Sequence, residues 1–286
     1  MKESVREAFA RRQPALVKKV VRGSRTWARS VADTPRMRPS FLILGGQRCG
    51  TTSLYRYLSD HPQVHPALVK EIQYFTLNYG KGPDWYRSNF PPIREKGISF
   101  DASPYYLFHP AAPKRAAALV PDARLIVLLR NPVDRAFSHY QHNVGLGVED
   151  LGFEAALDAE EHRLAGEEER LANDPGYFSP AHRRYSYAAR GRYELQLARW
   201  LEYYGPAALK VVVSEEFFAD PGGTLDGMLE FLGLTNFRLE RYEAYSRRGR
   251  WDGPPLSEQT RGRLQEHFRE HIGSLEARLG RSMPWK

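Results

Sequence analysis

The stretch over residues 41–53 constrains the fold most strongly, because an apolar run there ends in a glycine-rich turn. Residues 41–44 are Phe-Leu-Ile-Leu, a pattern that predicts a strand buried on both faces, as in a parallel sheet. Three glycines between residues 45 and 50 permit positive φ angles and close approach of the backbone to a ligand. Residues 51–58 predict a helix whose first N–H groups and dipole face an anion in that turn. The stretch therefore predicts a strand, loop and helix that together bind phosphate.

The loop departs at one position from the nucleotide-binding pattern G-x-x-x-x-G-K-[ST]. Thr51 stands where that pattern has its lysine, and the cation of the loop is Arg48 instead. In NTP-hydrolysing proteins the lysine reaches the β- and γ-phosphates, so its absence argues against ordinary NTP chemistry. Taken alone, the stretch also fits a purely structural turn between a strand and a helix.

The charge balance and the cysteine count narrow the class of protein. The 286 residues are enough for one α/β domain with a substantial core. With 42 lysines and arginines against 34 aspartates and glutamates, the net charge of +8 favours anionic ligands: nucleotides, acidic glycans, nucleic acids or acidic membranes. The one cysteine, Cys49, excludes an internal disulfide framework and a cysteine-based zinc site. We therefore expect a soluble protein in the reducing cytoplasm.

Residues 1–38 form a basic N-terminal extension, in which arginines and lysines are interleaved with apolar residues. Two interpretations stay open: a basic amphipathic helix on an anionic membrane or a partner protein, or a solvated extension that packs loosely on the domain. Pro35 and Pro39 mark the boundary, so we expect one domain over residues 39–286. In the first interpretation the protein is cytoplasmic but associated with the membrane.

A second junction of a strand and a helix follows the most apolar strand of the chain, residues 123–129. Arg130 stands at its carboxyl end, and the Asn-Pro pair that follows is a good helix start. Ser138 and His142 are four residues apart, so they lie on one face of that helix. Ligands of open α/β sheets bind at the carboxyl ends of the strands, which brings Arg130 and the first loop to the same crevice.

Other segments are candidates for the walls of the ligand-binding cleft or for further strands of the sheet. Residues 70–75, Lys-Glu-Ile-Gln-Tyr-Phe, place a charged pair beside an aromatic run, which fits either a cleft wall or an ordinary surface pair. Residues 245–251 form a basic, glycine-containing loop with a tryptophan, which fits either a clamp on phosphates or a solvated run of charge. Further strands are expected over residues 63–65, 97–101 and 209–213, and a break in helical structure over residues 220–223.

These motifs together resemble the sulfotransferase family. Residues 46–53, Gly-Gln-Arg-Cys-Gly-Thr-Thr-Ser, resemble its 5′-phosphosulfate loop, and residues 128–140 resemble its 3′-phosphate motif, with Arg130 at the strand end and Ser138 eight residues later. Within the family the chain is similar to the heparan sulfate group, in particular N-deacetylase/N-sulfotransferases and 3-O-sulfotransferases. Further counterparts follow in the same order at residues 70–75, 81–86, 116–119, 138–142 and 248–250.

The resemblance implies a fold, a donor and a set of donor-binding residues. The fold is a three-layer P-loop-type α/β sandwich with a central, mainly parallel sheet flanked by helices. The co-substrate is 3′-phosphoadenosine 5′-phosphosulfate, the product is adenosine 3′,5′-bisphosphate, and no metal is required. The implied donor-binding residues are Gln47, Arg48, Cys49, Gly50, Thr51, Thr52, Ser53, Arg130, Ser138, Arg248, Gly249 and Arg250.

The resemblance also implies roles in catalysis. Glu71 is the general base, Arg48 stabilises charge on the leaving phosphate, and His142 orients the acceptor or assists the base. The acceptor is a hydroxyl or an amine, carried by a glycan or another small molecule, and no nucleic acid takes part. The family loop usually has a lysine at the position of Arg48, which alters the hydrogen-bonding geometry but keeps the charge. We expect acceptor specificity to lie in residues 76–95 and 143–190.

Two alternatives come from other classes of protein. A nucleotide kinase with an atypical P-loop shares the first loop, but it needs the lysine that Thr51 replaces and leaves Arg130 and Ser138 unexplained. A non-catalytic protein that binds polyanions accounts for the charge of the chain. It does not account for two anion sites at strand ends.

Overall fold

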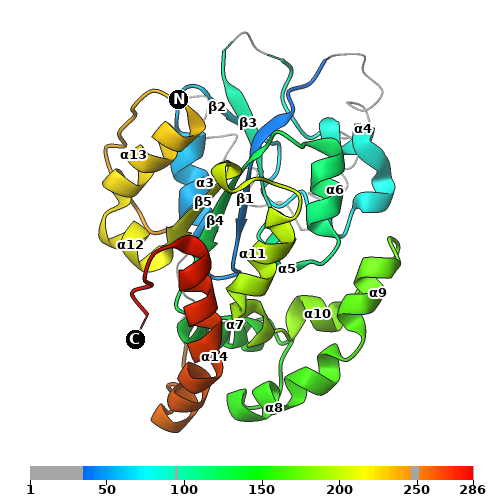
Figure 1. Ribbon diagram of the computed structural model, residues 1–286, viewed down its shortest axis with the longest axis vertical. Coiled ribbons are helices and arrows are strands. Elements are labelled where there is room, and N and C mark those ends of the chain that lie inside the picture. The colour runs from blue at the N-terminus through cyan, green and yellow to red at the C-terminus, as the bar shows by residue number, and fades with distance from the viewer. Residues whose placement is uncertain (1–34, 94–95, 246–250, 286) are drawn as a thin grey trace.

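The computed structural model describes residues 35–93, 96–245 and 251–285. The predicted basic extension over residues 1–38 therefore lies almost wholly outside the described residues. A five-stranded sheet in the order β2-β3-β1-β4-β5 forms the middle layer of the domain (Figure 1). The strands are β1 (Pro39–Gly45), β2 (Val64–Pro66), β3 (Ile98–Ala102), β4 (Arg124–Leu129) and β5 (Leu209–Val213).

Helices cover both faces of this sheet and extend beyond its carboxyl edge (Figure 1). The described α-helices are α3 (Thr51–Ser59), α4 (Gly82–Arg87), α5 (Tyr105–Phe108), α6 (Ala112–Leu119), α7 (Pro132–Gly145), α8 (Phe153–Leu164), α9 (Glu167–Asn173), α10 (Pro180–Arg184), α11 (Tyr193–Leu201), α12 (Ser214–Ala219), α13 (Pro221–Leu232) and α14 (Glu258–Leu279). The described 3₁₀-helices are η1 (Tyr79–Lys81), η2 (Ala189–Gly191) and η3 (Pro206–Ala208). No helix in the described part of the chain is long and apolar enough to cross a membrane.

The alternation of side chains along β1 divides the core into two layers. Phe41 and Ile43 pack with α3, α12 and α13 on one face of the sheet. Leu42 and Leu44 face the other way and pack with α4, α6 and α11. Because both faces are covered, the strand is apolar at every core position, as residues 41–44 predict.

The five strands pair only in the parallel sense, which confirms the predicted three-layer α/β sandwich. Parallel pairing brings the carboxyl ends of β1, β3, β4 and β5 to one edge. The residues that follow these ends therefore meet there: the glycine-rich loop after β1, Ser103 after β3, Arg130 after β4 and Ser214 after β5.

The predicted break in helical structure over residues 220–223 is present but shorter than expected. Helix α12 ends at Ala219, the non-helical Asp220 follows, and α13 begins at Pro221. The carboxylate of Asp220 accepts a hydrogen bond of 2.9 Å from the Gly223 N–H, and proline occupies the first helical turn, where its missing N–H costs nothing. A capped proline start resembles a break in the sequence, because the same residue types serve both.

Candidate active site

The glycine-rich loop is fixed by its neighbours in the sheet. The Gly46 N–H donates to the carbonyl of Leu128 in β4 at 2.9 Å, and the Ser214 hydroxyl at the end of β5 donates to the carbonyl of Cys49 at 2.6 Å. Gly50 precedes α3 with φ +90°, and a Cβ there would lie 2.9 Å from the ring of Phe218. The turn therefore needs glycine for both its backbone angle and its packing.

Arg48 connects the two predicted anion sites. Its Nε donates to the Ser138 hydroxyl at 3.2 Å, and its carbonyl accepts from Arg130 Nη1 at 3.3 Å. Residues from the first loop, the end of β4 and helix α7 thus meet at one point, as the parallel sheet predicts. Ser138 is almost fully buried at this contact.

On one side of this contact, Arg130 and Ser138 line a cavity of about 320 Å³. Phe137 and Trp251 contribute aromatic side chains to it, and Asp134 and Arg261 form an ion pair of 3.2 Å at its margin. We call this space the side cavity. Its combination of a cation, a hydroxyl and aromatic rings suits a phosphate attached to a flat base.

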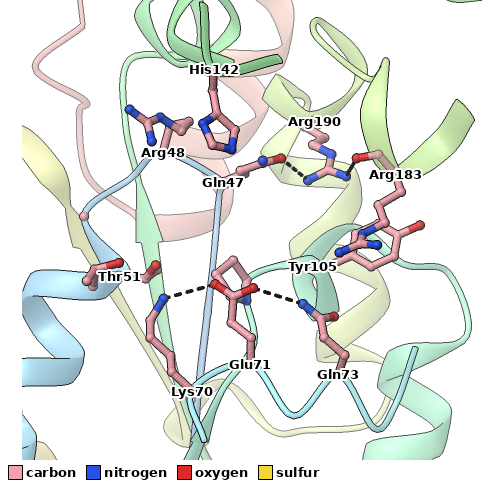
Figure 2. A pocket seen from close by; sticks show the side chains of 13 residues that line it. Gln47, Arg48, Thr51, Lys70, Glu71, Gln73, Tyr105, His142, Arg183 and Arg190 are labelled. Atoms are coloured by element: carbon pink, nitrogen blue, oxygen red, sulfur yellow. Dashed lines mark hydrogen bonds and ion pairs between the residues drawn. The ribbon is translucent and has the colours of Figure 1, made fainter. Parts of the chain in front are cut away.

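On the other side lies a central cavity of about 330 Å³ (Figure 2). It is lined by Gln47, Arg48, Gly50, Thr51, Thr52, Lys70, Glu71, Gln73, Pro104, Tyr105, His142, Arg183 and Arg190. Figure 2 shows Glu71 pointing into this space from one side, with Arg48 and His142 on the opposite side. The glycine-rich loop and the carboxylate thus face each other across one cavity.

The Glu71 carboxylate is held by one donor at each oxygen. Lys70 Nζ donates to Oε1 at 3.1 Å and Gln73 Nε2 donates to Oε2 at 3.3 Å. The side chain is nevertheless 43% exposed, so the carboxylate is accessible to a molecule in the cavity. The backbone of Glu71 has φ 63° and that of Gln73 φ 56°, both in the left-handed region that non-glycine residues rarely adopt.

His142 reaches the central cavity from α7. Burial lowers the pKa of its imidazole, and the neighbouring charge of Arg48 lowers that pKa further. The ring is therefore neutral at physiological pH, with one nitrogen able to accept a hydrogen bond.

Two of the predicted donor-binding residues shape the loop instead of lining a cavity. The Cys49 side chain is fully buried, and burial raises its pKa to about 12 against the opposing effect of Arg135. Ser53 is also fully buried; its hydroxyl accepts from the Tyr245 N–H at 3.1 Å and its own N–H donates to the Gly50 carbonyl. The turn into α3 directs both side chains inward, so the expected contact of these two residues with the donor is through the backbone, and it stays a prediction.

The structure does not describe three of the predicted donor-binding residues: Arg248, Gly249 and Arg250. The cavity also contains residues that the sequence did not single out for the site: Lys70, Gln73, Pro104, Tyr105, Arg183 and Arg190. Lys70 and Gln73 flank Glu71 in one motif and could have been found there. The two arginines come from the segment expected on the acceptor side, where no motif marks them.

Arg190 has a structural role in the wall. It is buried, its Nη1 donates to Gln47 Oε1 at 2.8 Å, and its Nη2 donates to the carbonyl of Arg183 at 2.7 Å. It thereby attaches the glycine-rich loop to α10. Within the described residues, no group of three or more histidine, cysteine, aspartate or glutamate side chains is arranged to hold a metal.

Comparison with known proteins identifies the family. Residues 38–270 match the family model described as sulfotransferase domain. The bifunctional heparan sulfate N-deacetylase/N-sulfotransferase 1 of Caenorhabditis elegans is 35% identical over 227 residues, covering 76% of this chain and 24% of that protein. The human bifunctional heparan sulfate N-deacetylase/N-sulfotransferase 2 is 31% identical over 283 residues, covering 86% of this chain and 30% of that protein. The chain therefore spans 24% and 30% of the lengths of these two relatives.

A solved structure agrees with the family match. The crystal structure of a sulfotransferase from Alicyclobacillus acidocaldarius has a TM-score of 0.71 and 31% sequence identity, covering 86% of this chain and 97% of that one. The chain belongs to the sulfotransferase family, which confirms the class predicted from its two phosphate motifs. The donor of that family is 3′-phosphoadenosine 5′-phosphosulfate, which fits a site with two separate anion-binding positions.

Proposed function

We propose that this protein transfers a sulfuryl group from 3′-phosphoadenosine 5′-phosphosulfate to a hydroxyl or an amine of a carbohydrate. The observation that carries the proposal is the placement of the Glu71 carboxylate and the glycine-rich loop on opposite sides of one cavity. The named activity of the relatives, heparan sulfate N-sulfotransferase, supports a glycan acceptor.

The donor occupies both cavities in this proposal. Its 5′-phosphosulfate lies against Arg48, Thr51 and Thr52, where the first N–H groups of α3 face the anion. Its 3′-phosphate lies against Arg130 and Ser138 in the side cavity. The contact between Arg48 and Ser138 separates the two positions, so that the two anionic groups of one nucleotide are held apart.

The reaction proceeds by attack of the acceptor oxygen or nitrogen on sulfur. Glu71 takes the proton that the acceptor loses, and the bond between sulfur and the bridging oxygen of the 5′-phosphate breaks. Arg48 stabilises the charge that develops on that oxygen, and adenosine 3′,5′-bisphosphate leaves. The neutral His142 accepts a hydrogen bond from the acceptor and orients it.

Two measurements test this function. We expect adenosine 3′,5′-bisphosphate to raise the melting temperature more than equal concentrations of magnesium ATP or heparin do. A kinase would respond most to ATP, and a non-catalytic polyanion binder would respond most to heparin. With labelled donor, we expect label on a glucosamine-containing oligosaccharide, located by mass spectrometry on a hydroxyl or an amine. Label on small aryl alcohols alone would contradict the carbohydrate acceptor.

The cellular setting stays a prediction. We propose that the protein acts in the cytoplasm and that the basic extension contacts anionic membranes; residues 1–34 of this extension lie outside the described part of the chain. Co-sedimentation with vesicles of anionic or zwitterionic lipid tests the contact. Binding to anionic vesicles that is lost on deletion of residues 1–34 supports it, and equal sedimentation of both forms contradicts it.

A further inference from the structure

The segment that carries Glu71 has a backbone that its own residues do not favour. Glu71 and Gln73 both have φ angles in the left-handed region, at 63° and 56°. Neither is glycine, and such conformations persist only where the surrounding structure fixes them. The contacts of this segment therefore determine where the Glu71 carboxylate lies.

Those contacts come from the end of β3 and from α5. The Glu71 N–H donates to the carbonyl of Ala102 at 3.0 Å. The Gln73 N–H donates to the Ser103 hydroxyl at 3.1 Å, and the Tyr74 N–H donates to the hydroxyl of Tyr106 at 2.7 Å. Two of the three N–H groups thus depend on side-chain hydroxyls that must offer a lone pair.

Asp101 fixes the direction of both hydroxyls. Its carboxylate is fully buried; Oδ1 accepts from the Ser103 hydroxyl at 2.9 Å and Oδ2 accepts from the Tyr106 hydroxyl at 2.7 Å. An ionised carboxylate only accepts hydrogen bonds, so each hydroxyl must donate its one proton to Asp101. The lone pairs of both hydroxyls are then directed to the backbone N–H groups of Gln73 and Tyr74.

We propose that Asp101 is a positioning residue for the general base: acting through Ser103 and Tyr106, it fixes the backbone from which Glu71 faces the sulfuryl group. This inference rests on the proposed function of Glu71. Asp101 does not line the central cavity, so it acts on the reaction only through the segment that it anchors.

The ionisation of Asp101 is consistent with this role. Burial raises its pKa to about 6, whereas hydrogen bonds from Tyr106, Ser103 and Tyr86 lower it and keep it from rising further. The carboxylate is therefore ionised at neutral pH, in the state that only accepts.

The chain offers a matched pair of variants. Tyr86 and Tyr106 are both buried and both donate to Oδ2 of Asp101, at 3.2 Å and 2.7 Å, but only the Tyr106 hydroxyl also accepts a backbone N–H of the segment. Tyr106→Phe and Tyr86→Phe each delete one buried phenol hydroxyl. We expect Tyr106→Phe to lower kcat about 10- to 100-fold, because small displacements of a catalytic group have large effects, and Tyr86→Phe to leave kcat within about twofold.

Further variants test the path from Asp101. Ser103→Ala should lower kcat like Tyr106→Phe, whereas Ser103→Thr keeps a hydroxyl and should restore most of the rate. Asp101→Asn should also lower kcat, because its amide nitrogen cannot accept from one of the two hydroxyls. In every variant the affinity for adenosine 3′,5′-bisphosphate should stay unchanged, since the glycine-rich loop is not altered.

Hydrogen exchange of the peptide over residues 71–76 gives a readout that does not depend on turnover. We expect faster exchange in Tyr106→Phe and Asp101→Asn than in Tyr86→Phe. Equal kcat and equal exchange rates in Tyr86→Phe and Tyr106→Phe would overturn the inference about Asp101. If the wild-type protein transfers the sulfuryl group in the same assay, the proposed function would still stand. Wild-type protein without sulfuryl transfer would instead overturn the function, and the exchange data would still decide whether Asp101 anchors the segment.

Discussion

The glycine-rich loop over residues 45–53 and the base segment over residues 71–76 both place left-handed backbone at the central cavity, but by different means. In the loop, Gly50 adopts φ +90° where a side chain would meet Phe218, and Arg48 is the one non-glycine residue of the loop with a positive φ, at 76°. In the base segment, Glu71 and Gln73 adopt such angles although glycine is absent from the segment. The loop therefore combines glycines with one left-handed side-chain residue, whereas the base segment has no glycine and depends on side chains that follow β3.

The difference matches the task of each region. A phosphosulfate is bound largely by backbone N–H groups, which glycine leaves accessible. A general base needs a side chain at a defined place, and a residue with a side chain cannot adopt a left-handed angle without help from its surroundings. Glu71 therefore depends on Ser103 and Tyr106, about thirty residues away in the sequence.

The largest effect is expected from Glu71→Gln. The amide keeps the size of the side chain but cannot take a proton, so kcat should fall by about 10²–10⁴-fold. The affinity for adenosine 3′,5′-bisphosphate, measured by calorimetry, should be largely kept. Glu230→Gln, on exposed surface of α13, serves as the control. Turnover of Glu71→Gln close to that of the wild type would remove Glu71 from the role of base.

The contrast between loop and base segment also explains how far the sequence alone could predict the site. The parallel sheet and the meeting of Arg48, Arg130 and Ser138 follow from apolar runs and strand ends, which are local signals. The left-handed backbone of Glu71 could not be predicted, because Ser103 and Tyr106 fix it from another element. Arg183 and Arg190 were missed for the same reason: their position depends on the packing of α10, which no motif encodes.

On the donor side, Arg130→Ala should weaken binding without changing the base segment. Loss of a hydrogen bond between a cation and a phosphate costs about 1.5–3 kcal/mol, so the Kd for adenosine 3′,5′-bisphosphate should rise about 10- to 100-fold. Arg124→Ala removes the same side chain from the opposite end of β4, at an exposed position, and should leave the Kd unchanged. Equal Kd values for Arg130→Ala and Arg124→Ala, measured by calorimetry, would disprove the 3′-phosphate assignment.

The dependence of the loop on glycine can be measured as stability. Gly50→Ala forces a side chain into left-handed backbone and places its Cβ 2.9 Å from the Phe218 ring, so we expect a loss of about 1–3 kcal/mol in the free energy of unfolding. Gly82→Ala meets φ +79° but no atom within 4 Å, and should lose less. Denaturant titration of both variants separates the free-energy cost of the left-handed backbone, which both share, from the cost of the contact with Phe218. Equal losses would show that the Phe218 contact is irrelevant.

The stability of the folded protein should respond to acid through two buried histidines, His109 and His182. The hydroxyl of Tyr105, which lines the central cavity, forms a hydrogen bond of 2.9 Å with His182 Nδ1. Burial, followed by the charge of Arg190, lowers the pKa of His182 to about 2, and burial with Arg115 lowers that of His109 to about 3. Both rings are therefore neutral in the folded protein at any pH in ordinary use.

The direction in which stability changes with pH follows from the unfolded chain, because each histidine has its ordinary pKa of 6.5 there. Below that pH the unfolded chain binds protons that the folded protein excludes, so stability is complete above pH 6.5 and is lost as the pH falls. Each histidine should contribute a slope approaching about 1.4 kcal/mol per pH unit. Denaturant titrations at pH 7, 6 and 5 should show a smaller slope for His182→Gln than for the wild type, and an unchanged slope for His162→Gln on the exposed surface of α8. If His182→Gln kept the full slope, His182 would titrate alike in the folded and unfolded states, which would contradict a ring held neutral by burial.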